Sequence, residues 1–239
     1  MSRHCFRRFQ VYGQRCSGTN ALIKLLEQNL EDLHFTEDYG FKHWLVPAQI
    51  EIPDDVFVIV IARRPDHWLR SLHATPWHAH PDLKAMDFSE FIRSEWRTVW
   101  DEDFWGMDSQ HPNFGRPITQ EMCPEARAPF CNPIAMRTAK LQNWVSTASR
   151  ARGHLLINHA ELVADPRSVL LRIACASQTR TRDAMKPVSS YKGHGKKPFR
   201  ISTYQELSEE DLLHVSRHIS PEIEEKFRVP VKGFGTTAA

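Results

Sequence analysis

The sequence predicts an α/β fold in which a central parallel sheet lies between two layers of helices. The run VFVIVIA, residues 56–62, is typical of a strand buried on both faces of a parallel sheet. Segments with strand and helix patterns alternate along most of the chain, and this order favours parallel strands joined by right-handed crossovers. Its 239 residues suffice for one sizeable core. We therefore expect a single domain over residues 1–239.

The first half of the chain is predicted to supply two units of a strand followed by a helix. Residues 6–12 form the first expected strand, and a turn with glycine separates it from a helix over about 18–29. Leucines in that helix are spaced for one buried face. After the strand at 56–62, a proline suits the start of a helix over 65–73.

Capping residues mark the expected helices of the second half. Asp87 with Glu90 predicts a helix over about 88–100, whose apolar stripe places Trp96 and Trp100 in the core. Residues 154–158 are expected to be a short buried strand. Further helices are predicted after Asn132, Asp165 and Ser208, each followed by a proline or an acidic first turn, and Pro221 is expected to open a last short helix.

Composition and charge narrow the classes of function. The net charge of +2 argues against a broad nucleic-acid surface. No apolar run reaches the ~20 residues that span a bilayer. The N-terminal residues lack the apolar stretch of a signal peptide, and the five scattered cysteines fit a reducing compartment. We therefore expect a cytoplasmic protein without a membrane span.

The stretch GQRCSGTN, residues 13–20, is the strongest candidate for a site. Gly13 and Gly18 have the spacing of a Walker phosphate loop, but Thr-Asn follows where Lys-Ser is expected. Without that lysine and the magnesium-binding hydroxyl, transfer of a γ-phosphate has little support. Arg15, the hydroxyls of Ser17 and Thr19 and a helix start suit an anion held without a metal. The alternative is an ordinary turn between a strand and a helix.

At this loop the chain resembles the sulfotransferases that use 3′-phosphoadenosine 5′-phosphosulfate (PAPS), whose loop commonly reads Lys/Arg-Ser-Gly-Thr-Thr. Here Cys16 precedes the serine, and the cation lies one position earlier, as in bacterial-type relatives that read G-x-R-x-S-G-T-N. The resemblance implies a three-layer P-loop-like fold and assigns donor binding to Gly13, Arg15, Cys16, Ser17, Gly18, Thr19 and Asn20.

A second motif follows the buried strand. Family members carry Arg-x-Pro there and a serine further on, and Arg63, Pro65 and Ser71 fit this spacing. The resemblance implies that Arg63 and Ser71 hold the 3′-phosphate of the nucleotide. Arg64 takes this place if the register shifts by one, and a helix cap or a solvated face is the structural alternative.

Two later segments complete the resemblance on the nucleotide side. Residues 186–200 carry five basic residues and no acidic one, where relatives have a loop that closes over the 3′-phosphate. The implied counterparts are Lys192 and Gly193, although a solvated basic loop has the same composition. His159 stands where the family often has a tyrosine on adenine, with a structural role as the alternative.

The segment GFKHWLVP, residues 40–47, supplies the candidate catalytic groups. Cytosolic sulfotransferases carry Lys-Thr-His-Leu-Pro on the strand before the Arg-x-Pro strand. The resemblance implies that His43 is the general base and that Lys42 contacts the phosphosulfate, with Arg15 as the third catalytic residue. In a regular strand Lys42 and His43 would point to opposite sides. Glu37 and Asp38 are the alternative bases.

Residues of about 74–132 are expected to form an insertion on the acceptor side. Three histidines between 73 and 80 are close in sequence, but nothing nearby completes a convincing metal site, so no metal is expected. Trp77 and Trp105 lie outside the apolar stripe of the helix expected over 88–100 and are the candidates for contacts with an acceptor. The implied reaction transfers a sulfuryl group from PAPS to a hydroxyl of a small molecule or glycan, releasing adenosine 3′,5′-bisphosphate. A P-loop kinase-like phosphotransferase and a non-catalytic nucleotide-binding relative remain alternatives.

Overall fold

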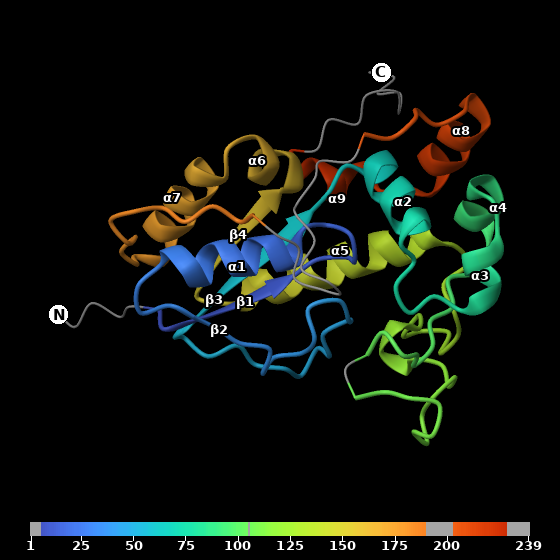
Figure 1. The fold of residues 1–239 in the computed structure, drawn as a ribbon, viewed down its shortest axis with the longest axis horizontal. Coiled ribbons are helices and arrows are strands. Elements are labelled where there is room, and N and C mark those ends of the chain that lie inside the picture. The colour runs from blue at the N-terminus through green and yellow to red at the C-terminus, as the bar shows by residue number, and fades with distance from the viewer. Residues whose placement is uncertain (1–5, 105, 190–202, 229–239) are drawn as a thin grey trace.

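A four-stranded parallel sheet lies at the centre of the computed structural model, which describes residues 6–104, 106–189 and 203–228 (Figure 1). The strand order is β2-β1-β3-β4. β1 (Arg8–Tyr12) pairs with β2 (His34–Phe35) on one side and with β3 (Val56–Ala62) on the other, and β3 also pairs with β4 (Gly153–Asn158). The predicted α/β class with an all-parallel sheet is confirmed.

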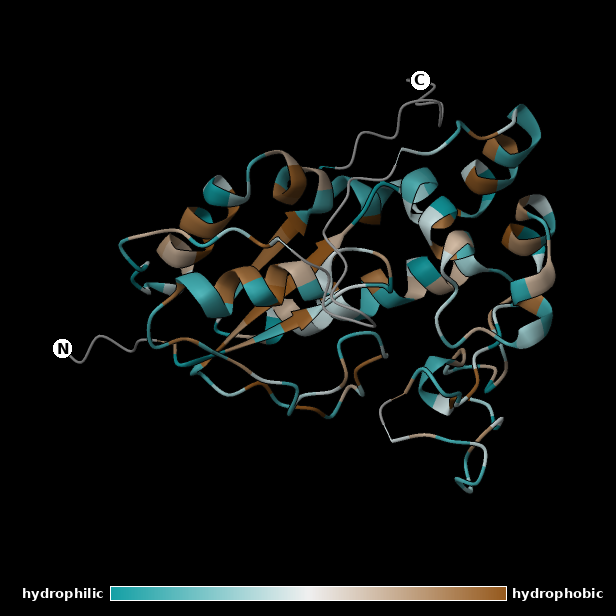
Figure 2. Cartoon of the chain, in the orientation of Figure 1, coloured by the Kyte–Doolittle hydropathy of each residue, from teal (hydrophilic) through white to brown (hydrophobic). Residues whose placement is uncertain are grey.

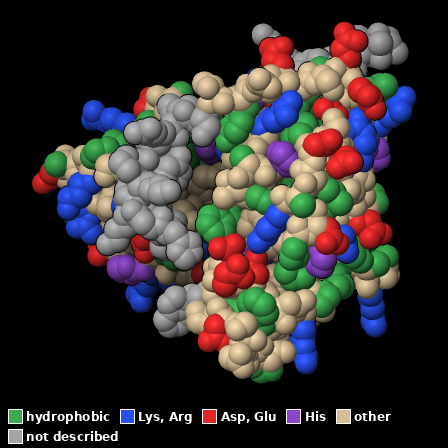
Figure 3. Space-filling model, turned by 45° about the vertical axis from the view of Figure 1, so that its right-hand side comes forward, with side chains coloured by type: hydrophobic (Ala, Val, Ile, Leu, Met, Phe, Trp, Pro, Cys, Tyr) green, Lys and Arg blue, Asp and Glu red, His purple; other side chains and the backbone are tan. Residues whose placement is uncertain are grey.

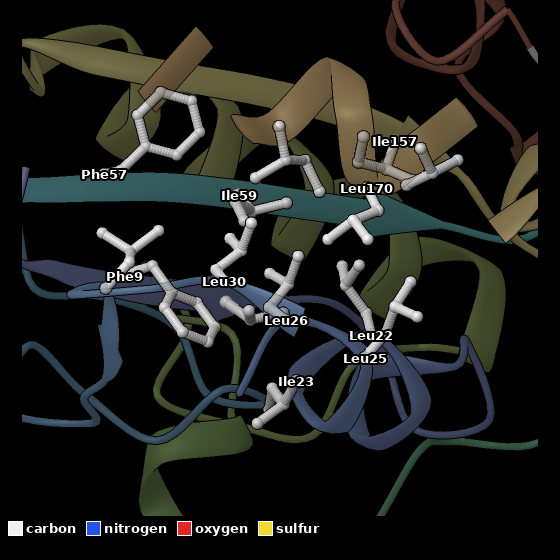
Figure 4. Packing of buried hydrophobic residues seen from close by; sticks show 14 of the residues in the cluster. Phe9, Leu22, Ile23, Leu25, Leu26, Leu30, Phe57, Ile59, Ile157 and Leu170 are labelled. Carbon is white, nitrogen blue, oxygen red and sulfur yellow. The ribbon is translucent and has the colours of Figure 1, made fainter. Parts of the chain in front are cut away.

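One face of the sheet is covered by α1 (Thr19–Asn29) and α7 (Pro166–Ser177), with α6 (His159–Ala164) beside them (Figure 1). Alternate residues of β1 and β3 point to this face, because successive side chains of a strand face opposite sides. They pack on the leucines of α1, as Figure 4 shows; the labelled residues include Phe9, Leu22, Leu26, Phe57, Ile59 and Leu170.

The other face is covered by α5 (Pro133–Arg150), with α9 (Pro221–Glu225) next to it. The remaining β3 residues are in one cluster with Leu141 and Trp144 of α5; they are Val56, Val58, Val60 and Ala62. β3 is therefore buried on both faces, as its apolar sequence predicts, and the hydrophobic colouring of the strands shows the same pattern (Figure 2). The molecule has three layers.

A separate hydrophobic cluster joins the helices beyond the sheet. It contains residues of α2 (Pro65–Ala74), α3 (Pro81–Ala85), α4 (Phe88–Arg93) and α8 (Glu209–His218), together with the start of α5. The 3₁₀ helix η1 (Thr119–Glu121) is also part of the chain between α2 and α5. The first part of the expected insertion, from about residue 79 to 96, thus packs with Phe130 and the helices α2 and α8 in one apolar cluster.

The helix expected over 88–100 is shorter in the structure and ends at Arg93. Its predicted cap is present, since the Asp87 side chain accepts a hydrogen bond from the Glu90 N–H. Further along, the backbone N–H groups bond to other segments: that of Trp96 donates to the Phe130 carbonyl. Tertiary pairing therefore overrides helical periodicity here, and Trp96 still lies in the core.

The other predicted caps are confirmed in the same way. The side chains of Asn132, Asp165 and Ser208 each accept a backbone N–H at the start of α5, α7 and α8. Among the described residues, no helix is both long and apolar enough to cross a membrane. On the face shown in Figure 3, acidic and basic side chains intermingle rather than gather by sign.

Candidate anion-binding site

The loop between β1 and α1 requires its two glycines. A Cβ on Gly13 would lie 2.7 Å from the Ile61 carbonyl oxygen, so only glycine lets the loop pass this close to β3. Gly18 caps α1 with φ of +82° in the left-handed region, and a Cβ there would approach the His159 ring to 2.7 Å. At both glycines of the predicted loop, a larger side chain would therefore clash with a neighbouring segment.

The start of α1 concentrates donors at this loop. The first N–H groups of an α-helix have no partner inside the helix and carry the positive end of its dipole. Ser17 and Thr19 are buried beside them. The Ser17 hydroxyl is fully buried and finds no hydrogen-bond partner among the described residues. A buried hydroxyl without a partner is costly, and an anion accepting from it would remove that cost.

Arg15 turns into the interior and meets a carboxylate of the insertion. Its Nη1 donates to both oxygens of Glu121, at 2.6 and 2.8 Å. The Lys140 ammonium binds the same carboxylate. The side chains of Arg15, Glu121 and Lys140 are 4%, 0% and 1% exposed respectively, so the whole group is shielded from water. The Nε and Nη2 atoms of Arg15 are buried without a partner in the described part of the chain.

The buried group holds two cations against one carboxylate. Burial works against the charge on Glu121, but Arg15 and Lys140 outweigh it and lower its pKa to about 2. Burial lowers the pKa of Lys140 to about 8, although Glu121 opposes the shift. At neutral pH Glu121 is therefore ionised and Lys140 mostly protonated. One positive charge remains uncompensated, a costly state in a protein interior unless an anion joins it.

Sequence reasoning missed Glu121 and Lys140. Lys140 could have been noticed in the sequence, because it lies with Arg137 on the apolar stripe of α5. Charged residues are rare at such buried positions. Glu121 lies in a short 3₁₀ helix without a recognisable motif, and nothing local predicts its burial.

Arg63 reaches the same loop from the end of β3. Its Nη1 donates to the Cys16 carbonyl at 3.0 Å, and its Nε is buried without a partner among the described residues. The guanidinium also lies 5.4 Å from the centroid of the Tyr204 ring. Arg63 and Arg15 both act electrostatically on the Cys16 thiol. The structure thus brings the two predicted arginines to one loop, close enough that both influence Cys16.

Cys16 and Ser71 meet at this point. Cys16 has a left-handed backbone with φ of 64°. Its thiol donates to the Thr75 carbonyl at 3.7 Å and lies close to Ser71. Burial raises the pKa of the thiol, so Cys16 stays neutral and is not an activated nucleophile. Ser71, on α2, therefore lies beside the loop. That it holds a 3′-phosphate stays a prediction. Arg64 instead pairs with Asp66 on the same helix.

His43 is held against the start of the loop. Its Nδ1 lies 2.6 Å from the Gly13 carbonyl oxygen and must donate to it, which leaves Nε2 as the nitrogen with the lone pair. The Gly13 N–H in turn donates to the Lys42 carbonyl. Burial, with Arg15, Lys42 and Lys140 nearby, lowers the pKa of His43 well below its usual range. The ring is therefore neutral, as a general base must be.

The segment around His43 is not the strand of the family pattern. Residues 36–55 contain no helix or strand, and the segment is instead held on α5, where Asn143 pairs with both backbone groups of Val46. The Lys42 ammonium pairs with Glu37 at 3.0 Å and packs on the Phe41 ring. Glu37 is therefore engaged, and the largely exposed Asp38 pairs with Arg8.

Two further histidines lie near Arg63. His159 at the end of β4 packs on Gly18, and burial, with Arg63 and His67 nearby, lowers its pKa to about 4. The His67 ring lies 6.3 Å from that of Tyr204. The ends of β1, β3 and β4 thus contribute polar groups to one edge of the sheet, where open α/β sheets bind ligands. The predicted residues Lys192 and Gly193 lie outside the described residues, as does Trp105.

The three histidines of residues 73–80 do not come together. His73 bonds to the Met86 carbonyl and His80 caps α3. His78 meets Asp101 instead, and with Asp103 these two side chains place possible ligand atoms within 4.8 Å of one another. Asp101 already accepts a hydrogen bond from His78 and pairs with the Lys84 ammonium.

No protein-family model matches the chain, and a search of curated proteins finds no match.

Proposed function

We propose that the protein is a sulfotransferase that moves a sulfuryl group from PAPS to a hydroxyl acceptor. One observation carries the proposal: a loop at a helix start contains buried donors without partners next to a buried surplus of positive charge. Such a site is complete only with an anion. A second set of donors, on Arg63 and Ser71, lies beside it and suits a second anionic group of the same ligand.

In this proposal, two separate groups of side chains bind the two anionic ends of the nucleotide. The loop donors and Arg15 would hold the phosphosulfate, and Arg63 with Ser71 would hold the 3′-phosphate. Lys192 and Gly193 would add to the second group. The Walker lysine and magnesium-binding hydroxyl are absent from the loop sequence, which counts against a kinase-like reaction.

The donor supplies an activated sulfuryl group, whose bond to the phosphate oxygen breaks as the acceptor oxygen forms its bond to sulfur. The acceptor hydroxyl must lose its proton in this step. His43 Nε2 has the lone pair that accepts it, because Nδ1 is fixed on Gly13. Arg15 and the loop N–H groups offset the negative charge that remains on the released phosphate.

Because cations surround His43, its pKa should depend on whether the anionic sulfuryl donor, PAPS, is bound. Arg15, Lys42 and Lys140 disfavour a positive imidazole. An anionic donor bound in the loop would offset these cations, raise the pKa of His43 and make proton transfer to it easier. This supports donor binding before proton transfer.

A non-catalytic nucleotide-binding protein is the second candidate, and the burial of His43 favours it. The side chain is held by Gly13, and the residue is only 8% exposed. Turnover separates the two candidates, since both predict binding of the nucleotide.

Calorimetry with adenosine 3′,5′-bisphosphate, compared with ATP and magnesium, tests the ligand. We expect the bisphosphate to bind preferentially, because the loop lacks the groups that hold a triphosphate with its metal. A preference for ATP with magnesium would overturn the proposal.

His43→Asn tests the base. The asparagine amide can keep the hydrogen bond to Gly13 but cannot take a proton, so we expect unchanged binding of the bisphosphate and loss of sulfuryl transfer from PAPS to a panel of hydroxyl acceptors. His154→Asn, at an exposed position of β4, is the matched control and should keep wild-type turnover. Retained turnover in His43→Asn would remove His43 from this role.

A further inference from the structure

We propose that Tyr204 holds the Arg63 guanidinium for the 3′-phosphate of the nucleotide, and that the protein thereby selects adenosine 3′,5′-bisphosphate over adenosine 5′-monophosphate. This inference rests on the proposed function and names a specificity-determining residue for it. The two residues come from distant parts of the chain, since Arg63 follows β3 and Tyr204 precedes α8. Tyr204 is a positioning residue, because it acts through Arg63.

The backbone around Tyr204 is fixed by the residues that follow it. Arg70 Nη2, on α2, donates to the Glu206 carbonyl at 3.0 Å. Leu207 is buried in the hydrophobic cluster of α2, α4 and α8, and the Ser208 side chain caps α8. These contacts join the segment to α2 and to α8, so the folded helices determine where the Tyr204 ring lies.

The Tyr204 ring contacts two side chains at the start of α2. The Arg63 guanidinium carbon lies 5.4 Å from the ring centroid, within the range of a cation–π contact. The centroid of the His67 ring lies 6.3 Å from that of Tyr204. A guanidinium has only donors, so His67 Nε2 must accept the hydrogen bond from Arg64, and the His67 ring is neutral. Tyr204 therefore contacts one cation and one neutral ring.

Arg63 keeps donors and charge for a ligand. Its Nη1 donates to the Cys16 carbonyl at 3.0 Å, and its Nε has no partner among the described residues. Three neighbouring arginines, Arg15, Arg64 and Arg137, are each paired with a carboxylate. No ion pair between described residues includes the half-buried Arg63, so an anionic ligand can still balance its charge.

Contact with the ring limits the conformations of the Arg63 side chain. A side chain that is already held loses less conformational freedom on binding, and its contact with phosphate is stronger for that reason. Adenosine 5′-monophosphate has no 3′-phosphate and gains nothing from this arrangement. Tyr204 should therefore affect affinity for the bisphosphate and leave affinity for the monophosphate unchanged.

Calorimetry of the full chain with the two nucleotides measures this selectivity. We expect the wild-type protein to prefer the bisphosphate. Tyr204→Phe keeps the aromatic face and should keep the preference, whereas Tyr204→Leu should lower it by about two- to fivefold. Gln205→Ala, at an exposed neighbouring position, is the matched control and should change neither affinity. An unchanged preference in Tyr204→Leu would refute the inference.

The double variant Arg63→Ala/Tyr204→Leu shows whether Tyr204 acts through Arg63. If it does, Tyr204→Leu causes no further loss of bisphosphate affinity once Arg63 is replaced. A further loss as large as that of the single variant contradicts the inference. Equal losses for both nucleotides in a folded Tyr204→Leu variant also contradict it, because the ring would then contact a part that the two nucleotides share.

Urea titration checks that Tyr204→Leu is folded, and Tyr204→Met replaces it if it is not. The failure of the proposed function has a different signature from the failure of this inference. A wild-type protein that prefers ATP with magnesium, or that binds neither adenosine nucleotide, refutes both. A preference for the bisphosphate that persists without the Tyr204 ring refutes the role of Tyr204 alone.

Discussion

Two buried arginines, Arg137 and Arg15, each pair with a buried glutamate but differ in how many of their donors are used. Arg137 Nε and Nη2 bind the two oxygens of Glu224 at 2.6 and 2.7 Å. Its Nη2 also donates to the Arg63 carbonyl and its Nη1 to Gln14. Every nitrogen of this guanidinium has a partner. Arg15 uses Nη1 alone for Glu121, while its other two nitrogens have none among the described residues.

The difference separates a structural ion pair from the proposed binding site. Arg137 joins α5 and α9 to the ends of β1 and β3, since it contacts Gln14 and the backbone of Arg63. It therefore holds the frame in which the loop lies. Arg15 is part of a group with a surplus charge and spare donors, which a ligand can complete. Both arginines are buried, so burial does not distinguish them. They differ in whether every guanidinium nitrogen has a hydrogen-bond partner among the described residues.

The largest expected effect comes from breaking the complete pair. Arg137→Met leaves the Glu224 carboxylate buried without its cation, so the free energy of unfolding should fall by about 3–5 kcal/mol in urea titration. Arg172→Met is the control, because its pair with Glu161 is largely exposed and should change stability by less than about 1 kcal/mol. Equal losses of unfolding free energy in Arg137→Met and Arg172→Met would show that the Arg137–Glu224 pair has no special structural role.

An intermediate effect is expected at the arginines of the loop, and on binding more than on stability. Arg63→Ala should weaken adenosine 3′,5′-bisphosphate by about tenfold, roughly 1.4 kcal/mol, because a charge-assisted contact to phosphate is lost. Arg15→Met should also weaken it while costing less stability than Arg137→Met, since Lys140 still balances Glu121. Calorimetry and urea titration on the same samples check both; unchanged affinity in Arg63→Ala would contradict the assignment.

The smallest expected effect is on pH dependence. Lys140 has a folded pKa of about 8, below its ordinary 10.5, so between these values the unfolded chain holds a proton that the folded chain has released. Stability from this group therefore rises with pH across that window. Affinity for adenosine 3′,5′-bisphosphate should fall as pH rises through about 8, because the surplus positive charge is lost. Lys140→Met should lack both the rise in stability and the fall in affinity. If the variant and the wild-type protein have identical pH profiles, Lys140 does not titrate in this range.

Much of the frame was predictable because it depends on local chemistry. The apolar run of β3, the caps at Asp87 and Asn132 and the glycines of the loop all report backbone conformation near their own positions. The helix over 88–100 was predicted too long because periodicity cannot show that Trp96 bonds to Phe130. The placement of Arg63 and Ser71 beside the loop agrees with the order of the motifs.

The sequence by itself determined the parallel sheet, the loop at the start of α1 and the arginines that follow β1 and β3. These features depend on propensity, periodicity and the rule that parallel strands end at one edge. Only the tertiary structure decided where Arg15 points and how much charge surrounds it. That outcome depends on Glu121 and Lys140, which arrive from distant segments and are buried together, and pairing of buried charges is set by three-dimensional packing rather than by spacing along the chain.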